Sequence, residues 1–476
     1  MSTLGHAAQR AALGTAFDVY LKKINNKGRE EELVKLVNTV EKYLGDYGDM
    51  INYDRIREII SDKDGFINQY INRILDEVDP KVLKTVALNF GYEAMYNGTR
   101  KIRSMREVHQ CNVPWLILMD PTSACNLHCT GCWAAEYGNK LNLTFEEMDH
   151  LIEQGKELGV YFYMFTGGEP LVRKKDLIRL CEKHKECAFL SFTNGTLVDE
   201  ELCKEMKRVG NFALAISLEG YEEVNDSRRG QGVYQKVMHA MDLLKENGLV
   251  FGTSICYTSK NCDTVSSKEF VKFMVDKGCK FAMYFHYMPV GNDASVELLP
   301  TKEQRAYMKD RIRQIRSIKE GEGLFTMDFQ NDGEFVGGCI AGGRNYFHIN
   351  ANGDAEPCVF IHYSGANIRT HTLLQILKQP LFMAYRDNQP FNENHLRPCP
   401  MLENPEILPR LVKETRAKST DLQSPESAEH LCNKCRLYAK CWQPCADQLW
   451  NEEEHHHESK YKNYKPKEIE LEQHCG

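Results

Sequence analysis

Between Pro114 and about residue 290 the chain alternates short apolar runs with segments of helical periodicity. The apolar runs are WLILMD at 115–120, YFYMFT at 161–166, FLSFT at 189–193, ALAISL at 213–218, LVFGTSICYT at 249–258 and KFAMYFHYM at 280–288. About six β/α units in series predict a parallel sheet, because parallel strands need a crossover between them. A partial barrel is the expected way to close it, with the chemistry beyond the carboxyl ends of the strands.

Different patterns on either side of this core predict two further domains. Between residues 12 and 96 apolar residues recur at helical spacing, as at Leu33, Leu36 and Val37. After a helix-like stretch over 301–319 the chain becomes rich in Gly, Asn and Cys. We therefore expect an α/β protein with an all-helical N-terminal domain over residues 1–110, a partial (β/α)6 TIM-like barrel over 111–322 and a loop-rich, metal-binding domain over 323–476.

Charge and composition exclude several classes of protein. The 476-residue chain carries 60 Lys and Arg against 67 Asp and Glu, a net charge of -7, so no basic field draws in nucleic acid. No apolar run approaches the ~20 residues that cross a bilayer, and the N-terminus has no secretion signal. We expect a cytoplasmic protein that is not integral to a membrane. In that reducing compartment its 18 cysteines indicate metal binding or catalysis before disulfides.

The loop after the first predicted strand carries three of these cysteines in the sequence CNLHCTGC. Cys125, Cys129 and Cys132 are close enough along the chain to bind one compact centre. A structural zinc site fills four positions, and His128 is the candidate for the fourth. Three ligands on a four-iron cluster would instead leave one iron open to a substrate or cofactor. The residues alone leave zinc as the alternative to iron.

This motif resembles the signature of the radical S-adenosylmethionine (SAM) superfamily, CxxxCxxC after the first strand of a partial barrel. The second predicted strand ends in TGGEP, which is similar to the GGEP element of the same family. The resemblance implies a SAM-binding 4Fe-4S cluster on the three cysteines. It also implies SAM contacts at Gly167, Gly168 and Glu169, where glycine lets backbone approach a ligand and a carboxylate suits the ammonium group of SAM.

Further positions are similar to SAM-binding residues of this family. Ser217 in ALAISLEG and Arg229 in NDSRRG are implied to hold the carboxylate and ribose of SAM, and Asn194 in the TNG turn is a further candidate. A strand-end cap and a surface arginine are the alternatives. The chain departs from the family where many members have an aromatic residue directly before the third cysteine. Gly131 stands there, and Trp133 after the cysteine either contacts the adenine or simply packs.

The cysteines of the predicted C-terminal domain resemble, in order and spacing, the SPASM extension of radical SAM enzymes, in which seven cysteines hold two auxiliary 4Fe-4S clusters. The resemblance assigns the first auxiliary cluster to Cys339, Cys358 and Cys445, with Cys399 as the candidate fourth ligand. It assigns the second to Cys432, Cys435, Cys441 and Cys475. A pair of zinc ribbons is the alternative. Seven cysteines lie outside any motif and are expected to be mostly core residues: Cys111, Cys181, Cys187, Cys203, Cys256, Cys262 and Cys279.

The resemblance implies a radical SAM enzyme that cleaves SAM reductively to a 5'-deoxyadenosyl radical, which then takes hydrogen from its substrate. The external electron donor would be a protein such as a flavodoxin or ferredoxin. The expected substrate is a peptide or protein side chain. A lipid or isoprenoid is the alternative, because apolar N-terminal helices could shelter an alkyl chain. A second alternative is a non-catalytic iron-sulfur electron carrier or zinc-binding protein, in which Glu169 would have no role.

Overall fold

The computed structural model describes residues 3–24, 28–45, 52–63, 65–134, 140–291 and 294–452. Its strands are β1 Leu116–Met119, β2 Phe162–Phe165, β3 Ala188–Thr193, β4 Phe212–Ser217, β5 Phe251–Tyr257, β6 Phe281–His286, β7 Phe325–Asp328, β8 Tyr346–Ile349, β9 Ala355–Glu356, β10 Tyr363–Ser364 and β11 Lys418–Ser419. The helices before β1 are α1 Thr3–Ile24, α2 Arg29–Leu44, α3 Tyr53–Ser61, α4 Phe66–Glu77, α5 Pro80–Val86, the π-helix η2 Ala87–Gly98 and α6 Thr99–His109.

The remaining helices alternate with the strands and then follow them. Between β1 and β7 they are α7 Phe145–Leu158, η4 Pro170–Arg173, α8 Lys174–Lys183, α9 Glu200–Val209, α10 Glu222–Arg229, α11 Val233–Glu246, α12 Cys262–Ser266, α13 Lys268–Asp276, η5 Val296–Leu298 and α14 Lys302–Ile315. After β7 they are α15 Gly333–Val336, α16 Leu373–Leu377, α17 Pro380–Asn388, α18 Ile407–Thr415 and α19 Ala428–Glu452.

One large sheet forms the centre of the molecule, in the order β7-β6-β5-β4-β3-β2-β1-β8-β9. Every pair from β7 to β8 is parallel, and only β9 runs antiparallel to its neighbour β8. All six predicted strands are present, and the helices between them provide the crossovers that parallel pairing requires. The expected α/β fold of partial-barrel type with a helical N-terminus is confirmed.

Local sequence signals fix the ends of the crossover helices. The helix α7 begins with a capping box, in which the Thr144 hydroxyl accepts from the Glu147 amide at 3.1 Å and the Glu147 carboxylate accepts from the Thr144 amide at 2.8 Å. Gly159, with φ +98°, ends the same helix in a left-handed C-cap. The apolar face of α7, with Met148, Leu151 and others, then packs on the sheet.

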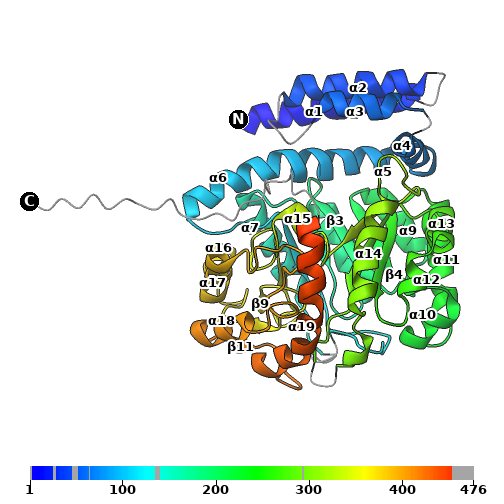
Figure 1. Cartoon of the computed structure of the whole chain (residues 1–476). Coiled ribbons are helices and arrows are strands. Elements are labelled where there is room, and N and C mark those ends of the chain that lie inside the picture. The colour runs from blue at the N-terminus through cyan, green and yellow to red at the C-terminus, as the bar shows by residue number, and fades with distance from the viewer. Residues whose placement is uncertain are drawn as a thin grey trace, which may run out of the picture.

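The N-terminal helices cover the end of the sheet where the strands begin. Figure 1 shows α1, α2 and α3 in a layer above the run of α5, η2 and α6, which lies directly on the barrel region. Phe90 of η2 packs edge to face on Trp115 and Phe162, with ring centroids 5.7 and 5.2 Å away. The Tyr70 hydroxyl of α4 donates to the Lys280 carbonyl before β6 at 2.6 Å. The amino ends of the strands are therefore closed by helices.

The segment after residue 322 contributes more regular structure than its loop-rich sequence predicts. The strand β7 extends one edge of the sheet beside β6, and β8 pairs with β1 at the other side. The helix α19, orange-red in Figure 1, runs for 25 residues and carries four cysteines.

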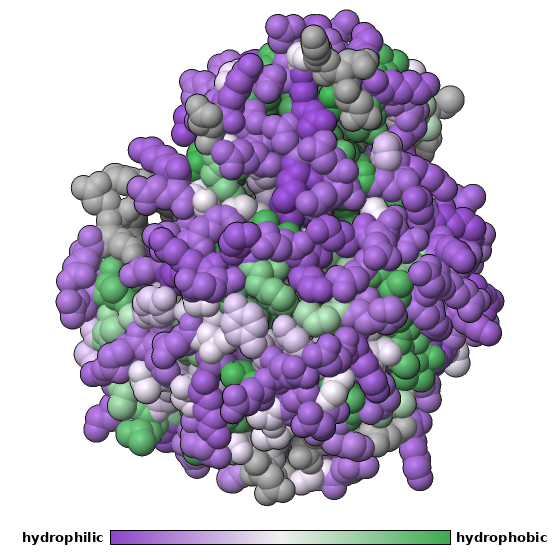
Figure 2. All heavy atoms as spheres, turned by 90° about the vertical axis from the view of Figure 1, so that its right-hand side faces the viewer, coloured by the Kyte–Doolittle hydropathy of each residue, from purple (hydrophilic) through white to green (hydrophobic). Residues whose placement is uncertain are grey.

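No helix in the described parts of the chain is long and apolar enough to span a membrane. The face of the molecule in Figure 2 is mainly hydrophilic, with small hydrophobic areas among the polar side chains.

Candidate active site

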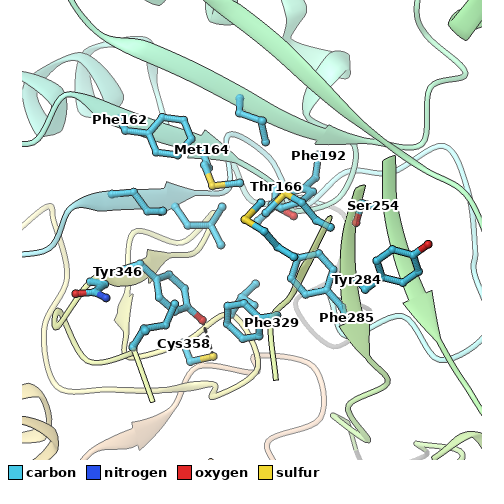
Figure 3. A pocket seen from close by; sticks show the side chains of 18 of the residues that line it. Phe162, Met164, Thr166, Phe192, Ser254, Tyr284, Phe285, Phe329, Tyr346 and Cys358 are labelled. Atoms are coloured by element: carbon cyan, nitrogen blue, oxygen red, sulfur yellow. Dashed lines mark hydrogen bonds between the residues drawn. The ribbon is translucent and has the colours of Figure 1, made fainter. Parts of the chain in front are cut away.

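A cavity of about 1680 Å³ occupies the inside of the curved sheet. Its wall includes Cys125, Cys129 and Cys132 at the carboxyl ends of the strands, as well as Cys339, Cys358 and Cys399 from the C-terminal region. Figure 3 shows side chains from β2, β3, β5, β6 and β8 converging on this space. The structure thus places six of the sequence-predicted cysteine ligands around one cavity.

The first cysteine loop follows β1 and is held by short local contacts. The Cys125 sulfur accepts from the Leu127 amide at 3.4 Å, and the Thr122 hydroxyl accepts from the Ala124 amide at 3.1 Å. Burial raises the pKa of Cys125 to about 11 and also raises the pKa of Cys129, and neighbouring thiols add to both shifts. Crowded thiols in a desolvated wall can lose their protons to a metal centre, whose positive charge relieves the repulsion.

The two glycines of the TGGEP segment let the loop after β2 pack directly on the cysteine loop. Gly167 has φ +114°, and a Cβ there would lie 2.5 Å from the Thr122 carbonyl oxygen. A Cβ on Gly168 would lie 2.2 Å from the carbonyl oxygen of Ala124, the residue before Cys125. Both glycines also line the cavity. Their absent side chains therefore bring the two loops together at the predicted SAM site.

Glu169 joins three loop segments beneath the cavity. Its carboxylate accepts from the Thr193 hydroxyl at 2.7 Å, the Asn194 amide at 2.7 Å and the Leu171 amide at 3.0 Å. Burial raises its pKa, against the effect of these donors. The Asn194 side chain in turn donates to the Asn126 side chain in the cysteine loop at 2.8 Å. Glu169 and Asn194, both predicted from the sequence, line the cavity and position the loops around it.

Two consecutive arginines at the end of α10 stand beside the cysteine loop. Nη1 of Arg229 lies 4.0 Å from the sulfur of Cys129, and its Nε donates to Glu219 at 3.0 Å. Nη1 of Arg228 pairs with the same carboxylate at 2.8 Å. Two guanidinium groups against one carboxylate leave one positive charge near the thiols, which suits an anionic thiolate-bound cluster. Sequence reasoning named Arg229 and missed Arg228, although the adjacent arginines in NDSRRG were visible.

Ser217 and the aromatic candidate Trp133 take different positions in the wall. Ser217 is the last residue of β4, half-buried and facing the cavity. Trp133 packs edge to face on His348 and Phe360, with ring centroids 5.8 and 6.4 Å away, so part of its ring contacts the C-terminal region. The space beside Gly131 is filled by Tyr287, just after β6, because a Cβ on Gly131 would lie 2.8 Å from Cε2 of its ring. Sequence reasoning missed Tyr287.

Three cysteines of the C-terminal region form a second group in the cavity wall. Burial raises the pKa of Cys358 to about 12 and that of Cys399 well above its ordinary value, and Cys339 contributes to both shifts. The Tyr346 hydroxyl donates to the Cys358 sulfur at 2.7 Å (Figure 3). Cys339 therefore lies near both Cys358 and Cys399, and all three thiols line the cavity.

The four cysteines on α19 do not share one face of the helix. Cys432 and Cys435 are buried on the side that packs toward the cavity wall, whereas Cys441 is exposed. Cys445 is half-buried in a separate cluster with Trp442. Cys475 lies outside the described residues. The continuous helix thus separates Cys445 from Cys339 and Cys358, and Cys441 from Cys432 and Cys435.

Of the seven cysteines outside the motifs, six are buried in the described structure. Cys256 differs, because it is half-buried near the end of β5 and lines the cavity close to the paired arginines.

Comparison with known families defines the class of this protein. Residues 119–260 match the model of the radical SAM superfamily, and residues 339–401 match the model of the SPASM iron-sulfur cluster-binding domain. The chain therefore carries a radical SAM domain and a C-terminal SPASM domain. These domains are the ones that hold SAM and 4Fe-4S clusters, auxiliary clusters included, and the buried thiols and cationic charge described above fit such groups.

The individual relatives share only about a quarter of their aligned residues with this chain. The chain is 27% identical over 233 residues to an Fe-coproporphyrin III synthase of Methanosarcina barkeri, covering 46% of this chain and 57% of the relative. It is 26% identical over 264 residues to the mycofactocin maturase MftC of Mycolicibacterium smegmatis, covering 52% and 65%. Both alignments span less than two thirds of the relative. The fold is similar to Streptococcus suis SuiB bound to S-adenosylmethionine, with a TM-score of 0.54, 17% identity and coverage of 70% and 81%.

Proposed function

We propose that this protein cleaves SAM reductively and uses the resulting radical to remove a hydrogen atom from an organic substrate held in the cavity. The observation that carries the proposal is the meeting of the cysteine loop, the TGGEP loop and the paired arginines at one end of that cavity. A non-catalytic electron carrier would not need a large cavity in contact with this loop.

The chain's own residues would bind and orient the groups of the reaction. Cys125, Cys129 and Cys132 would hold the SAM-binding cluster, while Arg229 and Arg228 balance its negative charge. When bound, the cluster supplies one electron to SAM, which yields methionine and a 5'-deoxyadenosyl radical that takes hydrogen from a C–H bond. Glu169 and Asn194 would keep the loops in place around the methionine portion of SAM. The surrounding wall excludes water from the radical.

The C-terminal cysteines would hold the auxiliary clusters. We propose that Cys399 joins Cys339 and Cys358 as a ligand, since the three thiols share one part of the wall. A closed cluster there would exchange electrons with the substrate radical without binding the substrate. A small external redox protein, such as a flavodoxin or ferredoxin, would supply the first electron.

The substrate expected from the sequence is a peptide or protein side chain. The names of the relatives mention mycofactocin and Fe-coproporphyrin III. A structure of SuiB is also known with its precursor peptide SuiA. These names differ in the molecules they mention, so the choice of substrate class for this chain depends on the cavity itself.

The test uses the variant Cys129→Ala in anaerobically reconstituted protein. The variant should lose about one of three 4Fe-4S clusters by iron and sulfide analysis, and it should produce no 5'-deoxyadenosine from SAM with a reductant. Cys203→Ala is the matched control, because Cys203 is buried on α9 away from the cavity. If Cys129→Ala still forms 5'-deoxyadenosine at the parent rate, the proposal is wrong.

A further inference from the structure

The cavity is lined along the strands by apolar side chains. Strands β1 to β6 contribute no Lys, Arg, Asp or Glu to its wall. They contribute mainly leucine, methionine and phenylalanine side chains, together with the hydroxyls of Ser217 and Ser254; the apolar ones include Leu118, Met164, Leu190, Phe192, Met283 and Phe285. In Figure 3 Phe162 and Met164 of β2, Phe192 of β3 and Phe285 of β6 point into the same space. The charged lining residues lie at the two ends of the cavity, such as Arg229 at one end and Arg103 of α6 at the other.

These inward-facing side chains do not fill the barrel. Along β6 the alternate residues Phe281, Met283 and Phe285 are half-buried, whereas Ala282 and the other outward-facing residues are buried. A packed barrel buries its inward-facing residues against one another. Here the interior positions are the less buried ones, so large apolar side chains border an unfilled space.

The size and chemistry of this space favour an apolar occupant. Pockets for small ligands usually have volumes of about 300–1,000 Å³, so 1680 Å³ leaves room beyond a cofactor of nucleoside size. Burial of apolar surface contributes roughly 25 cal/mol per Å², and water gains few hydrogen bonds in an apolar cavity. A hydrocarbon in this space would remove the exposed phenylalanine and methionine surface from water.

A peptide backbone suits the same space poorly. Each buried peptide group needs hydrogen-bond partners, and each unsatisfied group costs about 1–3 kcal/mol. The backbones of β1 to β6 already pair with a neighbouring strand on both sides. Apart from the hydroxyls of Ser217 and Ser254, their inward-facing side chains are mainly apolar, so they offer few replacements for those partners.

We propose that the substrate of this protein carries a long hydrocarbon chain, alkyl or isoprenoid, which lies along the barrel from the cysteine loop toward Phe90 and Trp115 at the amino ends of the strands. This inference rests on the proposed radical SAM function and specifies its substrate class. The chain would present one of its C–H bonds at the end of the cavity where Cys125, Cys129 and Cys132 lie.

Binding is tested first, separately from the chemistry, with the anaerobically reconstituted holoprotein and cis-parinaric acid, a fluorescent long-chain fatty acid. Saturable binding is expected. Leu190→Glu puts a charge in the wall and should weaken binding by at least about tenfold. Val19→Glu is the matched control and should leave binding unchanged, because Val19 is 44% exposed on α1 and does not line the cavity. Ala213→Trp narrows the same cavity without adding a charge and should also weaken binding of the probe. This variant provides the test if Leu190→Glu does not fold.

Hydrogen transfer is tested next with deuterated substrates. Holoprotein, SAM and a reductant are incubated with perdeuterated fatty acid, perdeuterated isoprenoid alcohol, vesicles of perdeuterated phosphatidylglycerol, or a deuterated peptide digest. Deuterium in 5'-deoxyadenosine from a hydrocarbon arm supports the inference, and comparing the free and vesicle arms identifies the source of the chain. Label from the peptide arm alone, or absence of saturable probe binding with normal SAM cleavage, would overturn it. Probe binding without any SAM cleavage would instead contradict the proposed function.

Discussion

Gly131 shows how one residue fixes the geometry of the cysteine loop. Its φ is +68°, a value that favours glycine, and a Cβ would meet the ring of Tyr287 at 2.8 Å. Many members of the radical SAM superfamily, whose model matches residues 119–260, have an aromatic residue directly before the third cysteine. In this chain an aromatic ring reaches the same place from the segment after β6, so the missing side chain and Tyr287 are complementary.

We predict that Gly131→Ala destabilises the protein by more than the cost of its backbone conformation alone, which is about 1–2 kcal/mol. The control is Gly232→Ala, because Gly232 has φ +78° with nothing within 4 Å of its Cβ position. The added contact with Tyr287 should make the Gly131 variant the less stable of the two in anaerobic denaturant titrations. Gly131→Ala with Tyr287→Leu should recover part of the loss. If Gly131→Ala and Gly232→Ala lower the free energy of unfolding equally, the contact between the added Cβ and Tyr287 costs no stability and the prediction is wrong.

The helix α19 shows how an element can conflict with the ligand set that its sequence implies. Cys432 and Cys441 are nine residues apart, so an α-helix places them on opposite faces and about 13 Å apart along its axis. One compact cluster cannot bind both while the helix remains continuous. Pro444 already interrupts the hydrogen bonding of the helix nearby.

If Cys432, Cys435 and Cys441 hold one cluster, loading it must unwind the helix between residues 435 and 441. We expect reconstitution to lower the far-ultraviolet circular dichroism signal at 222 nm by the equivalent of about two helical turns. Cys441→Ala should remove both that change and one cluster, as judged by iron content. A complete set of three clusters with the helical signal unchanged would show that Cys441 is not a ligand.

At the scale of the whole molecule, a buried ionic group joins the barrel to the C-terminal region. His348 of β8 contacts Asp120 after β1 at 2.8 Å and Glu356 of β9 at 2.7 Å, and all three side chains are buried. Burial lowers the pKa of His348, but the charges and hydrogen bonds of the two carboxylates outweigh it and raise the pKa to about 10. The imidazolium therefore stays charged in the folded protein at neutral pH, next to Trp133 and the cysteine loop.

This raised pKa predicts a specific pH dependence of stability. The pKa of His348 is near 6.5 when unfolded, so its stabilising contribution is complete below about pH 6.5 and is lost as the pH rises toward 10. The free energy of unfolding should fall over that window in the parent protein, and less steeply in His348→Gln. At pH 7 the variant should be less stable by about 3–5 kcal/mol, because two buried carboxylates lose their partner.

Denaturant titrations at several pH values measure this effect. His371→Gln is the control, since His371 is exposed and should leave the profile unchanged. Parallel profiles for the parent and His348→Gln would contradict the prediction.

Much of the barrel and of the first cysteine site could be predicted from the sequence. The six strands were visible because apolar runs and helical periodicity are local patterns, and Cys125, Cys129 and Cys132 lie within one loop. The strands β7 and β8 were not predicted, because each is four residues long and its role depends on pairing with β6 or β1 far away in the chain. The domain boundaries at 110/111 and 322/323 stay predictions.

The sequence by itself determined the class of chemistry, because clustered thiols, paired glycines and a carboxylate at fixed spacing restrict what a loop can bind. Only the tertiary structure decided which distant residues meet. It placed Cys399 beside Cys339 and Cys358, and it brought Tyr287 to Gly131. It also left a space inside the barrel that is bordered mainly by apolar side chains. Those features depend on contacts between segments 41 to 156 residues apart in the chain and on the volume they enclose, and no local pattern of residues specifies either.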